Sequence, residues 1–248
     1  MDGTVDPVRD AELINLELAL ADLAQVEKRL ERVKKDRKAE AAEKSALEKV
    51  QAVLLRDQPA RMAVLDEEED LSIKSLGLLT RKPIIYAANV QDSDLATGNE
   101  MVDRLRVMAE AEGAKLVLVS AQVESELVDL PPEDRAEFLE SLGVSLETTG
   151  LRKLVREAYS LLNLSTYYTS GPTETRAWTI TRGWKAPKAA GVIHNDFERG
   201  FIRAETVSYE DLVATGSEQE AKAKGLMRSE GKDYEVQEGD VILFRFNV

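Results

Sequence analysis

The stretch from Lys82 to Glu126 constrains the fold of this chain more than any other. It contains two apolar runs that are typical of buried strands, Pro83–Ala88 and Leu116–Val119. Between them, apolar residues at helical spacing predict a helix that Gly113 ends. A strand, a helix and a second strand form a βαβ unit, and its right-handed crossover makes the two strands parallel. The sequence therefore predicts an α/β fold.

Each predicted strand is followed by a short polar segment. Asn89-Val90-Gln91-Asp92, here called the first strand-end loop, follows one strand, and Ser120-Ala121-Gln122, the second strand-end loop, follows the other. Ligands of open α/β sheets bind at the carboxyl ends of the strands, so we interpret the two loops as the base-recognition half of a purine nucleotide site. The alternative from the residues alone is an Asx turn formed after the strand by Asn89 and Asp92.

Residues 10–56 have the pattern of a helical hairpin. Apolar residues between Ala19 and Val33 repeat at heptad spacing, and Leu47–Leu54 continues the helical pattern after a polar break. We favour two antiparallel helices over one uninterrupted helix. A second apolar stripe predicts that the start of the hairpin packs on a globular body; it consists of Leu13, Leu16 and Leu20. A further helix is expected over residues 67–78.

The expected tip of the hairpin is basic, although the chain has a formal net charge of -13. A solvated helix face is one explanation, and phosphate binding is the other. The candidate residues for phosphate binding, and through it for RNA binding, are Arg32, Lys34, Lys35, Arg37 and Lys38. The negative net charge argues against a general coat for nucleic acids, and no DNA partner is expected. No apolar run approaches the roughly 20 residues that span a bilayer, so no membrane partner is expected either.

From about Thr166 the pattern changes to short strands and glycine-rich turns, which predicts a small α+β module. Strands are expected at residues 176–180, 201–207 and 241–246, and short helices at 186–193 and 209–213. His194 is the only histidine and the chain has no cysteine, which argues against a zinc site and favours a structural role for His194. We assign no catalytic residue and no metal ligand.

Several segments resemble the YchF family, the Obg-like ATPases within the translation-factor-related P-loop NTPases. They are Val5–Pro7 leading into Glu17–Leu23, Ala88–Val90, and His194–Thr206 together with Glu230–Tyr234. The resemblance covers essentially the whole chain. It implies a partial P-loop NTPase (Rossmann-like) α/β domain with an inserted helical coiled-coil hairpin, followed by a C-terminal α+β module, the TGS domain with its β-grasp fold.

The resemblance also implies domain boundaries. Residues 1–8 would be a remnant of the nucleotide domain, and 9–81 the inserted hairpin with the helix that follows it, the hairpin itself covering 9–57. Residues 82–164 would be the C-terminal half of the nucleotide domain, and 165–248 the TGS domain.

Two phosphate-side motifs of this family do not occur in the sequence. The sequence contains no G-x-x-x-x-G-K-[ST] loop, and Gly231-Lys232-Asp233 cannot replace it because that segment lacks the spacing and the Ser/Thr. The Asp-x-x-Gly loop that helps to hold Mg²⁺ is also missing. We therefore expect a family member without its N-terminal third, or a nonfunctional fragment. Intact members bind and hydrolyse ATP with Mg²⁺, whereas this chain is expected to bind nucleotide weakly or not at all and to be inactive alone.

The resemblance assigns base-binding roles to Asn89, Val90, Asp92, Ser120, Ala121 and Gln122. GTPases carry Asn-Lys-x-Asp in the first loop, and this family usually carries Asn-x-x-Glu, which goes with a preference for ATP. This chain keeps the Asn as Asn89, lacks the Lys and has Asp92 in place of the Glu. The family implies ATP, and the return to Asp leaves GTP as the alternative.

Two functional hypotheses follow. The first is a purine nucleotide switch that regulates the ribosome, and the second is a nucleotide-independent RNA- or ribosome-binding module made of the coiled coil and the TGS domain. The family is cytosolic, which implies a cytoplasmic protein; an organellar copy would carry its transit peptide in the missing N-terminal region.

Overall fold

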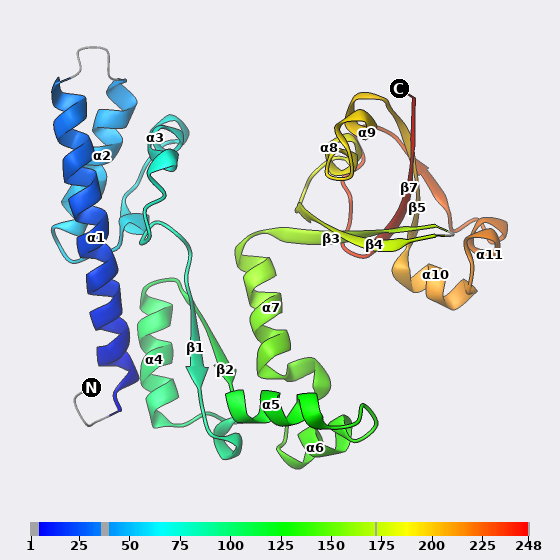
Figure 1. The fold of residues 1–248 in the computed structure, drawn as a ribbon, viewed down its shortest axis with the longest axis horizontal. Helices are drawn as coiled ribbons and strands as arrows, with labels where there is room; N and C mark the ends of the chain where they lie inside the picture. The colour runs from blue at the N-terminus through cyan, green and yellow to red at the C-terminus, as the bar shows by residue number, and fades with distance from the viewer. Residues whose placement is uncertain (1–4, 36–39, 172, 248) are drawn as a thin grey trace. The chain divides into compact units, whose positions relative to one another are not determined.

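The computed structural model describes residues 5–35, 40–171 and 173–247. The chain divides into two compact units, Met1–Glu157 and Ala158–Val248, and each has its own hydrophobic core (Figure 1). The finer domain boundaries given above stay predictions. Among the described helices, none is both long enough and apolar enough to cross a membrane.

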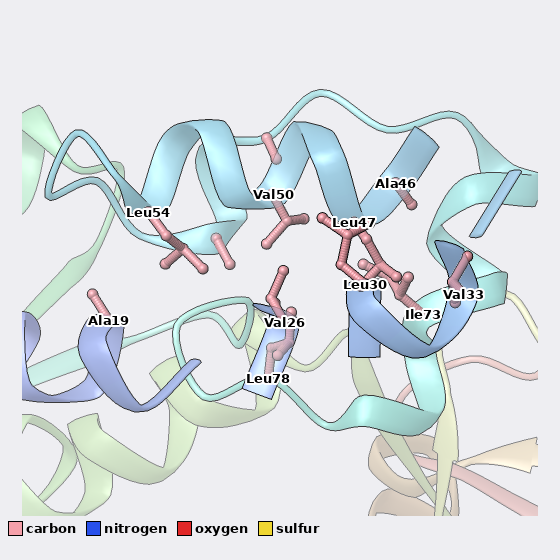
Figure 2. Packing of buried hydrophobic residues seen from close by; sticks show 12 residues of the cluster. Ala19, Val26, Leu30, Val33, Ala46, Leu47, Val50, Leu54, Ile73 and Leu78 are labelled. Atoms are coloured by element: carbon pink, nitrogen blue, oxygen red, sulfur yellow. The ribbon is translucent and has the colours of Figure 1, made fainter. Parts of the chain in front are cut away.

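The first unit begins with the predicted helical hairpin. Helix α1 (Pro7–Lys35) is followed by α2 (Ala41–Leu54), and the two run antiparallel (Figure 1). Their facing side chains form a buried cluster, which Figure 2 shows. It includes the heptad positions Ala19, Val26, Leu30 and Val33 of α1 and the residues Ala46, Leu47, Val50 and Leu54 of α2. The hairpin is therefore confirmed, and the uninterrupted helix is excluded.

The start of α1 packs on the rest of the first unit, against helix α4 (Glu100–Ala111), as predicted, but the second apolar stripe does not make this contact. Leu13, Leu16 and Leu20 are 55%, 39% and 54% exposed, so the start of α1 does not bury them against the described residues. The contact of this end of α1 with the rest of the unit is polar instead. The Asn15 Nδ2 group donates a hydrogen bond to the Tyr86 hydroxyl at 2.7 Å.

A buried carboxylate joins the hairpin to the following segment. Asp22 accepts hydrogen bonds from Leu79 N at 2.8 Å, from Thr80 N at 2.7 Å and from the Thr80 hydroxyl at 2.7 Å. Between the hairpin and Leu79, the chain forms a 3₁₀ turn, Ala60–Met62, and helix α3 (Glu67–Ile73). The expected helix over 67–78 is shorter than predicted, because a 3₁₀ turn replaces it after Ile73 and Gly77 ends that turn with a φ of +61°.

The βαβ unit has the predicted connectivity. Strand β1 (Ile85–Asn89) pairs in parallel with β2 (Lys115–Val119), and helix α4 (Glu100–Ala111) connects them. Three helices follow β2, namely α5 (Ala121–Asp129), α6 (Arg135–Ser141) and α7 (Gly150–Leu161). Helices α5 and α6 bury a small cluster of Leu95, Val123, Leu127 and Leu139.

The C-terminal unit is built on a mixed five-stranded sheet with the order β4-β3-β7-β5-β6. The strands are β3 (Leu164–Ser170), β4 (Thr175–Thr181), β5 (Phe201–Ser208), β6 (Arg228–Glu230) and β7 (Asp240–Phe246). Strand β3 lies parallel to β7, and the other pairs are antiparallel. The three predicted strands are confirmed, whereas β3 and β6 were not predicted as separate strands.

Helices cover both faces of this sheet. The helices α8 (Ala186–Gly191) and α9 (Asn195–Arg199) pack on the face that carries Ile242 and Phe244. The opposite face carries Val207 and Val241 and is covered by α10 (Tyr209–Thr215) and α11 (Glu218–Ala223). His194 caps α9, because its Nδ1 atom accepts a hydrogen bond from Asp196 N at 3.2 Å. This contact agrees with the structural role predicted for His194.

Candidate functional site

The two strand-end loops lie against each other at the carboxyl ends of β1 and β2. Asn89 is in register with Val119, and Val90 N donates to Val119 O at 2.9 Å. The side chain of Asn89 then crosses to the second loop, where its Oδ1 atom accepts a hydrogen bond from Ala121 N at 3.0 Å. The structure thus brings together the segments that the sequence placed at one sheet edge.

The second strand-end loop is also the start of helix α5. The Ser120 side chain is buried and caps the helix, since its Oγ atom accepts from Val123 N at 3.3 Å. Ala121 and Gln122 are exposed, and the Gln122 amide donates to Glu126 Oε1 at 3.0 Å. Two first-turn N–H groups of α5 therefore have side-chain acceptors, Ala121 N on Asn89 and Val123 N on Ser120.

Asp92 lies at the exposed start of a 3₁₀ turn, Asp92–Asp94. Its Oδ1 atom accepts from Ser93 N at 3.0 Å, so this carboxylate is partly engaged in a local turn. Asn89 is not, because its side chain bonds across to Ala121. An Asx turn would bond the backbone two residues on, whereas Asp92 bonds the adjacent Ser93 N and Asn89 bonds across to Ala121, so these two contacts are not Asx turns.

A cavity of about 550 Å³ opens beside the first strand-end loop. It lies between the start of α1, strand β1 and helix α4, and its volume is in the range of small-molecule sites. Its polar lining residues are Asn89, Gln91, Asp94 and Asn99. Asp92 and the second loop are not among the lining residues, so the cavity adjoins one loop and not both.

Asp94 and Asn99 were not predicted as part of the site. The Asn99 amide donates to Asp94 Oδ2 at 2.8 Å, while its Oδ1 atom accepts from Val102 N at 3.1 Å and caps α4. The sequence signal that could have identified Asn99 was its position directly before a helical pattern, which is typical of a helix N-cap. The hydrogen bond between Asp94 and Asn99 joins the 3₁₀ turn after the first strand-end loop to the start of α4.

Charged and polar groups surround the base of α1. Asp6 accepts hydrogen bonds from Arg9 N and from the Arg104 guanidinium, and these donors hold the pKa of Asp6 below its usual value. Next to Asn15 of α1, the Tyr86 hydroxyl of β1 donates to Glu112 Oε2 at 3.0 Å. Arg61 pairs with the same oxygen at 2.8 Å. Burial raises the pKa of Tyr86. These contacts join α1 to strand β1 and to helix α4.

The described residues do not hold a metal site or a phosphate loop. Among them, no group of three or more His, Cys, Asp or Glu side chains could bind a metal ion. The sequence has no G-x-x-x-x-G-K-[ST] motif.

The basic candidates lie at the far end of the hairpin. Arg32, Lys34 and Lys35 are exposed on the last turn of α1. Arg37 and Lys38 lie outside the described residues. Just before this end, Arg29 pairs with Glu43 of α2 at 2.6 Å, which ties the two helices together below the basic residues.

The fold of the first unit is of the GTPase-like, nucleotide-binding α/β class, with a helical hairpin before the βαβ unit. The chain is 34% identical to a solved chain described as the Schizosaccharomyces pombe YchF GTPase, with a TM-score of 0.78. The match covers 99% of this chain and 68% of that one. A GTP binding protein from Pyrococcus horikoshii shares the fold, with a TM-score of 0.59 at 19% identity, over 98% of this chain and 72% of that one.

Sequence comparison identifies the family. The chain is 50% identical over 253 residues to the ribosome-binding ATPase YchF of Bacillus subtilis, and 48% identical over 251 residues to that of Haemophilus influenzae. Each match covers 99% of this chain and 68% of the relative. Residues 164–247 match a family model, YchF-GTPase_C, described as a protein of unknown function (DUF933). The chain belongs to the YchF family of Obg-like ATPases, so the resemblance is confirmed.

Proposed function

We propose that this chain is the base-recognising part, and the C-terminal module, of a purine nucleotide switch that acts on the ribosome. The observation that carries this proposal is the hydrogen bond from Ala121 N to Asn89 Oδ1 at 3.0 Å, which joins the two strand-end loops at the ends of adjacent parallel strands. The bacterial relatives are named ribosome-binding ATPases, which supports the same reading.

In this proposal the base is read by the first strand-end loop. Asn89 braces the second loop, and Asp92 uses one carboxylate oxygen for its local turn, so its other oxygen is available to accept from the N–H groups of a purine. ATP is the proposed ligand and GTP the alternative. A site built for particular N–H groups discriminates strongly, because a mismatched base leaves polar groups unpaired.

The sequence limits what this half of the site can do. Tight binding and turnover of a triphosphate rest on a phosphate loop, its Lys and Mg²⁺, which would serve the intact switch. With base contacts alone we expect affinities of about 1 mM, worth roughly 4 kcal/mol, and no hydrolysis.

Nuclear magnetic resonance spectroscopy of the whole chain tests the base site. ATP and GTP at millimolar concentration should shift the backbone amide signals of Asn89, Ala121 and Gln122. Asn89→Ala should abolish these shifts, and Ser93→Ala, a change of the exposed residue directly after the first strand-end loop, should preserve them. Micromolar affinity or release of phosphate would contradict the half-site, and unchanged amide signals would remove the base site altogether.

For contact with the ribosome we propose the basic end of the hairpin. Arg32, Lys34 and Lys35 project from the last turn of a helix and are exposed, as a phosphate-binding surface requires. The proposed β-grasp TGS module, for which the mixed sheet β4-β3-β7-β5-β6 provides support, would take part. If nucleotide has no effect on association, the second function applies, a nucleotide-independent RNA- or ribosome-binding module.

Charge reversal tests the hairpin. Replacing Lys34 and Lys35 by Glu should weaken cosedimentation with ribosomes and lower its salt dependence, because fewer counterions are then released from phosphates. The matched control reverses two exposed charges of the first unit that lie outside the hairpin, Lys82 and Lys153, and should leave cosedimentation unchanged. Equal loss in both variants would mean that net charge alone governs association, and no loss in either would make the tip a solvated helix face.

A further inference from the structure

Strand β4 forms one edge of the sheet in the C-terminal unit. It pairs with β3 on one side, and within the part of the chain that the structure describes no strand pairs with its other side. An edge strand presents a row of N–H and C=O groups that another chain can bind. With seven residues, Thr175–Thr181, β4 is long enough for an added strand.

The pairing of β3 with β4 determines which backbone groups face outward. Arg182 N donates to Asn163 O at 2.8 Å, and Gly171 N donates to Glu174 O at 2.9 Å, one at each end of the ladder. Hydrogen-bonded pairs alternate along an antiparallel ladder, so even-numbered residues of β4 bond to β3. The N–H and C=O groups of Thr175, Ala177 and Thr179 therefore point away from the sheet.

These three residues leave the edge open. Their side chains are exposed, small and uncharged, whereas natural edges are usually blocked by lysine, proline or a bulge. Two side-chain contacts lie here: the Tyr159 hydroxyl of α7 is 3.3 Å from Thr179 Oγ1, and Ser170 Oγ is 3.5 Å from Thr175 Oγ1. Neither involves the backbone groups of β4.

The surroundings of this edge are positively charged. The stretch from Thr175 to Asn195 contains Arg176, Arg182, Lys185 and Lys188 and no acidic residue, in a chain with a net charge of -13. Lys185 pairs with Asp233 at 2.7 Å and is therefore largely neutralised. Arg176 lies 3.9 Å from the exposed Glu174, a loose pair, and Arg182 is exposed.

Two of the cations are held over aromatic rings. The Arg176 guanidinium lies 4.3 Å from the centroid of the Trp178 ring, and Lys188 Nζ lies 4.1 Å from that of Trp184. A cation restrained in this way loses less side-chain freedom when an anionic partner binds.

Both pairs belong to the α8 face of the sheet. Trp178 is opposite Tyr167 in the ladder, and the Tyr167 hydroxyl donates to Ala189 O of α8 at 3.0 Å. Lys188 directly precedes Ala189 on α8. Cations therefore flank the open edge on the α8 face.

We propose that the β4 edge binds an extended acidic segment of a partner protein as an additional strand. Backbone hydrogen bonds to Thr175, Ala177 and Thr179 supply affinity, and acidic side chains that alternate along the added strand meet Arg176, Arg182 and Lys188. A second copy of β4 is disfavoured as the occupant, because pairing would bring its basic residues against these. This surface belongs to the C-terminal unit, and its proposed binding does not rest on the nucleotide proposal.

Hydrogen exchange at single amides tests this proposal on the whole chain. The probe is a synthetic peptide of alternating Glu and Val, about nine residues long, which matches a strand of this length. At saturation it should slow amide exchange at Ala177 and Thr179 by about tenfold or more, as expected for backbone groups that become hydrogen-bonded. The amide exchange rate of Trp178, whose N–H faces β3, should change little. A peptide of alternating Lys and Val should not slow exchange at Ala177 or Thr179.

Variants separate strand addition from general attraction of anions. Ala177→Pro removes an outward N–H without removing a hydrogen bond to β3. It should weaken peptide binding about tenfold, whereas Ala177→Ser should leave peptide binding unchanged. The double variant Arg182→Glu, Lys188→Glu should also weaken peptide binding. The control double variant Lys222→Glu, Lys224→Glu should leave peptide binding unchanged. Binding without protection at Ala177 and Thr179, equal binding of single-stranded RNA and the acidic peptide, or self-association through this edge would each overturn the proposal.

Discussion

Glu69 shows how a single residue can hold two helices together. It is buried on α3 and accepts hydrogen bonds from Lys49 Nζ at 2.6 Å and from the Ser45 hydroxyl at 2.6 Å, both on α2. It also accepts from Asp66 N at 3.0 Å, which completes the capping box of α3. These donors, Lys49 foremost, lower the pKa of Glu69 from 4.5 to about 2.

The depressed pKa predicts an acid-sensitive hairpin. Because the folded pKa of Glu69 is about 2 and the ordinary value is 4.5, its stabilising effect is present above pH 4.5 and is lost as the pH falls towards 2. Urea midpoints followed by circular dichroism should therefore fall more between pH 5 and about pH 2.5 in the unmodified chain than in Glu69→Gln. The exposed neighbour variant Glu68→Gln should keep the full dependence. Equal pH profiles for all three proteins would show that Glu69 does not contribute.

Residue patterns predicted which segments meet at the site but not how they meet. Asn89 and Ser120 were correctly placed at neighbouring strand ends, because strand order follows from a βαβ pattern. The bond from Ala121 N to Asn89 Oδ1 joins residues 32 positions apart, and the cap that Ser120 forms for α5 turns its side chain inward. These details depend on the exact twist of two strands, which apolar periodicity does not specify.

At the scale of elements, helix α7 begins directly against strand β2. A Cβ atom at Gly150 would lie 2.7 Å from Val119 Cα and 2.8 Å from Leu118 O. Both are backbone atoms of β2, and Val119 precedes the second strand-end loop. The absence of a side chain at Gly150 therefore allows α7 to pack close under the candidate site.

Gly150→Ala should destabilise the first unit by about 1–3 kcal/mol, the usual cost of overpacking, because neither backbone atom can move freely. The urea midpoint measured by circular dichroism checks this. Gly231→Ala is the control, since a Cβ atom there has no neighbour within 4 Å and its effect should be small. A midpoint for Gly150→Ala as high as that of the control would mean that α7 shifts at no cost.

The elements differed in how well the sequence predicted them. The hairpin was clear because Val26, Leu30 and Leu47 repeat at the spacing that a helix pair buries. The stripe of Leu13 and its neighbours has the same spacing and is exposed, because periodicity identifies an apolar face without identifying what covers it. Strand β3 gave little signal, since its sequence LSTYYTS is polar although Tyr167 is fully buried.

At the scale of the whole molecule, the two units have separate cores. The core of the C-terminal unit includes Tyr167, Phe201 and Phe244, and the aromatic rings of Tyr167 and Phe244 meet edge to face at 5.7 Å. Both tryptophans of the chain, Trp178 and Trp184, pack on this core. Tryptophan fluorescence therefore reports on the C-terminal unit, while circular dichroism is dominated by the helices of the first.

Separate cores predict that the C-terminal unit folds by itself. A fragment of residues 158–248 should unfold in urea in one cooperative transition, because its sheet and both helical layers are complete without the first unit. Its fluorescence midpoint should equal the fluorescence midpoint of the whole chain. Gly150→Ala in the whole chain should lower the circular dichroism midpoint and leave the fluorescence midpoint unchanged, which serves as an internal control. A fragment that is unfolded in buffer, or a fluorescence midpoint that follows Gly150→Ala, would show instead that the stability of the C-terminal unit depends on the first.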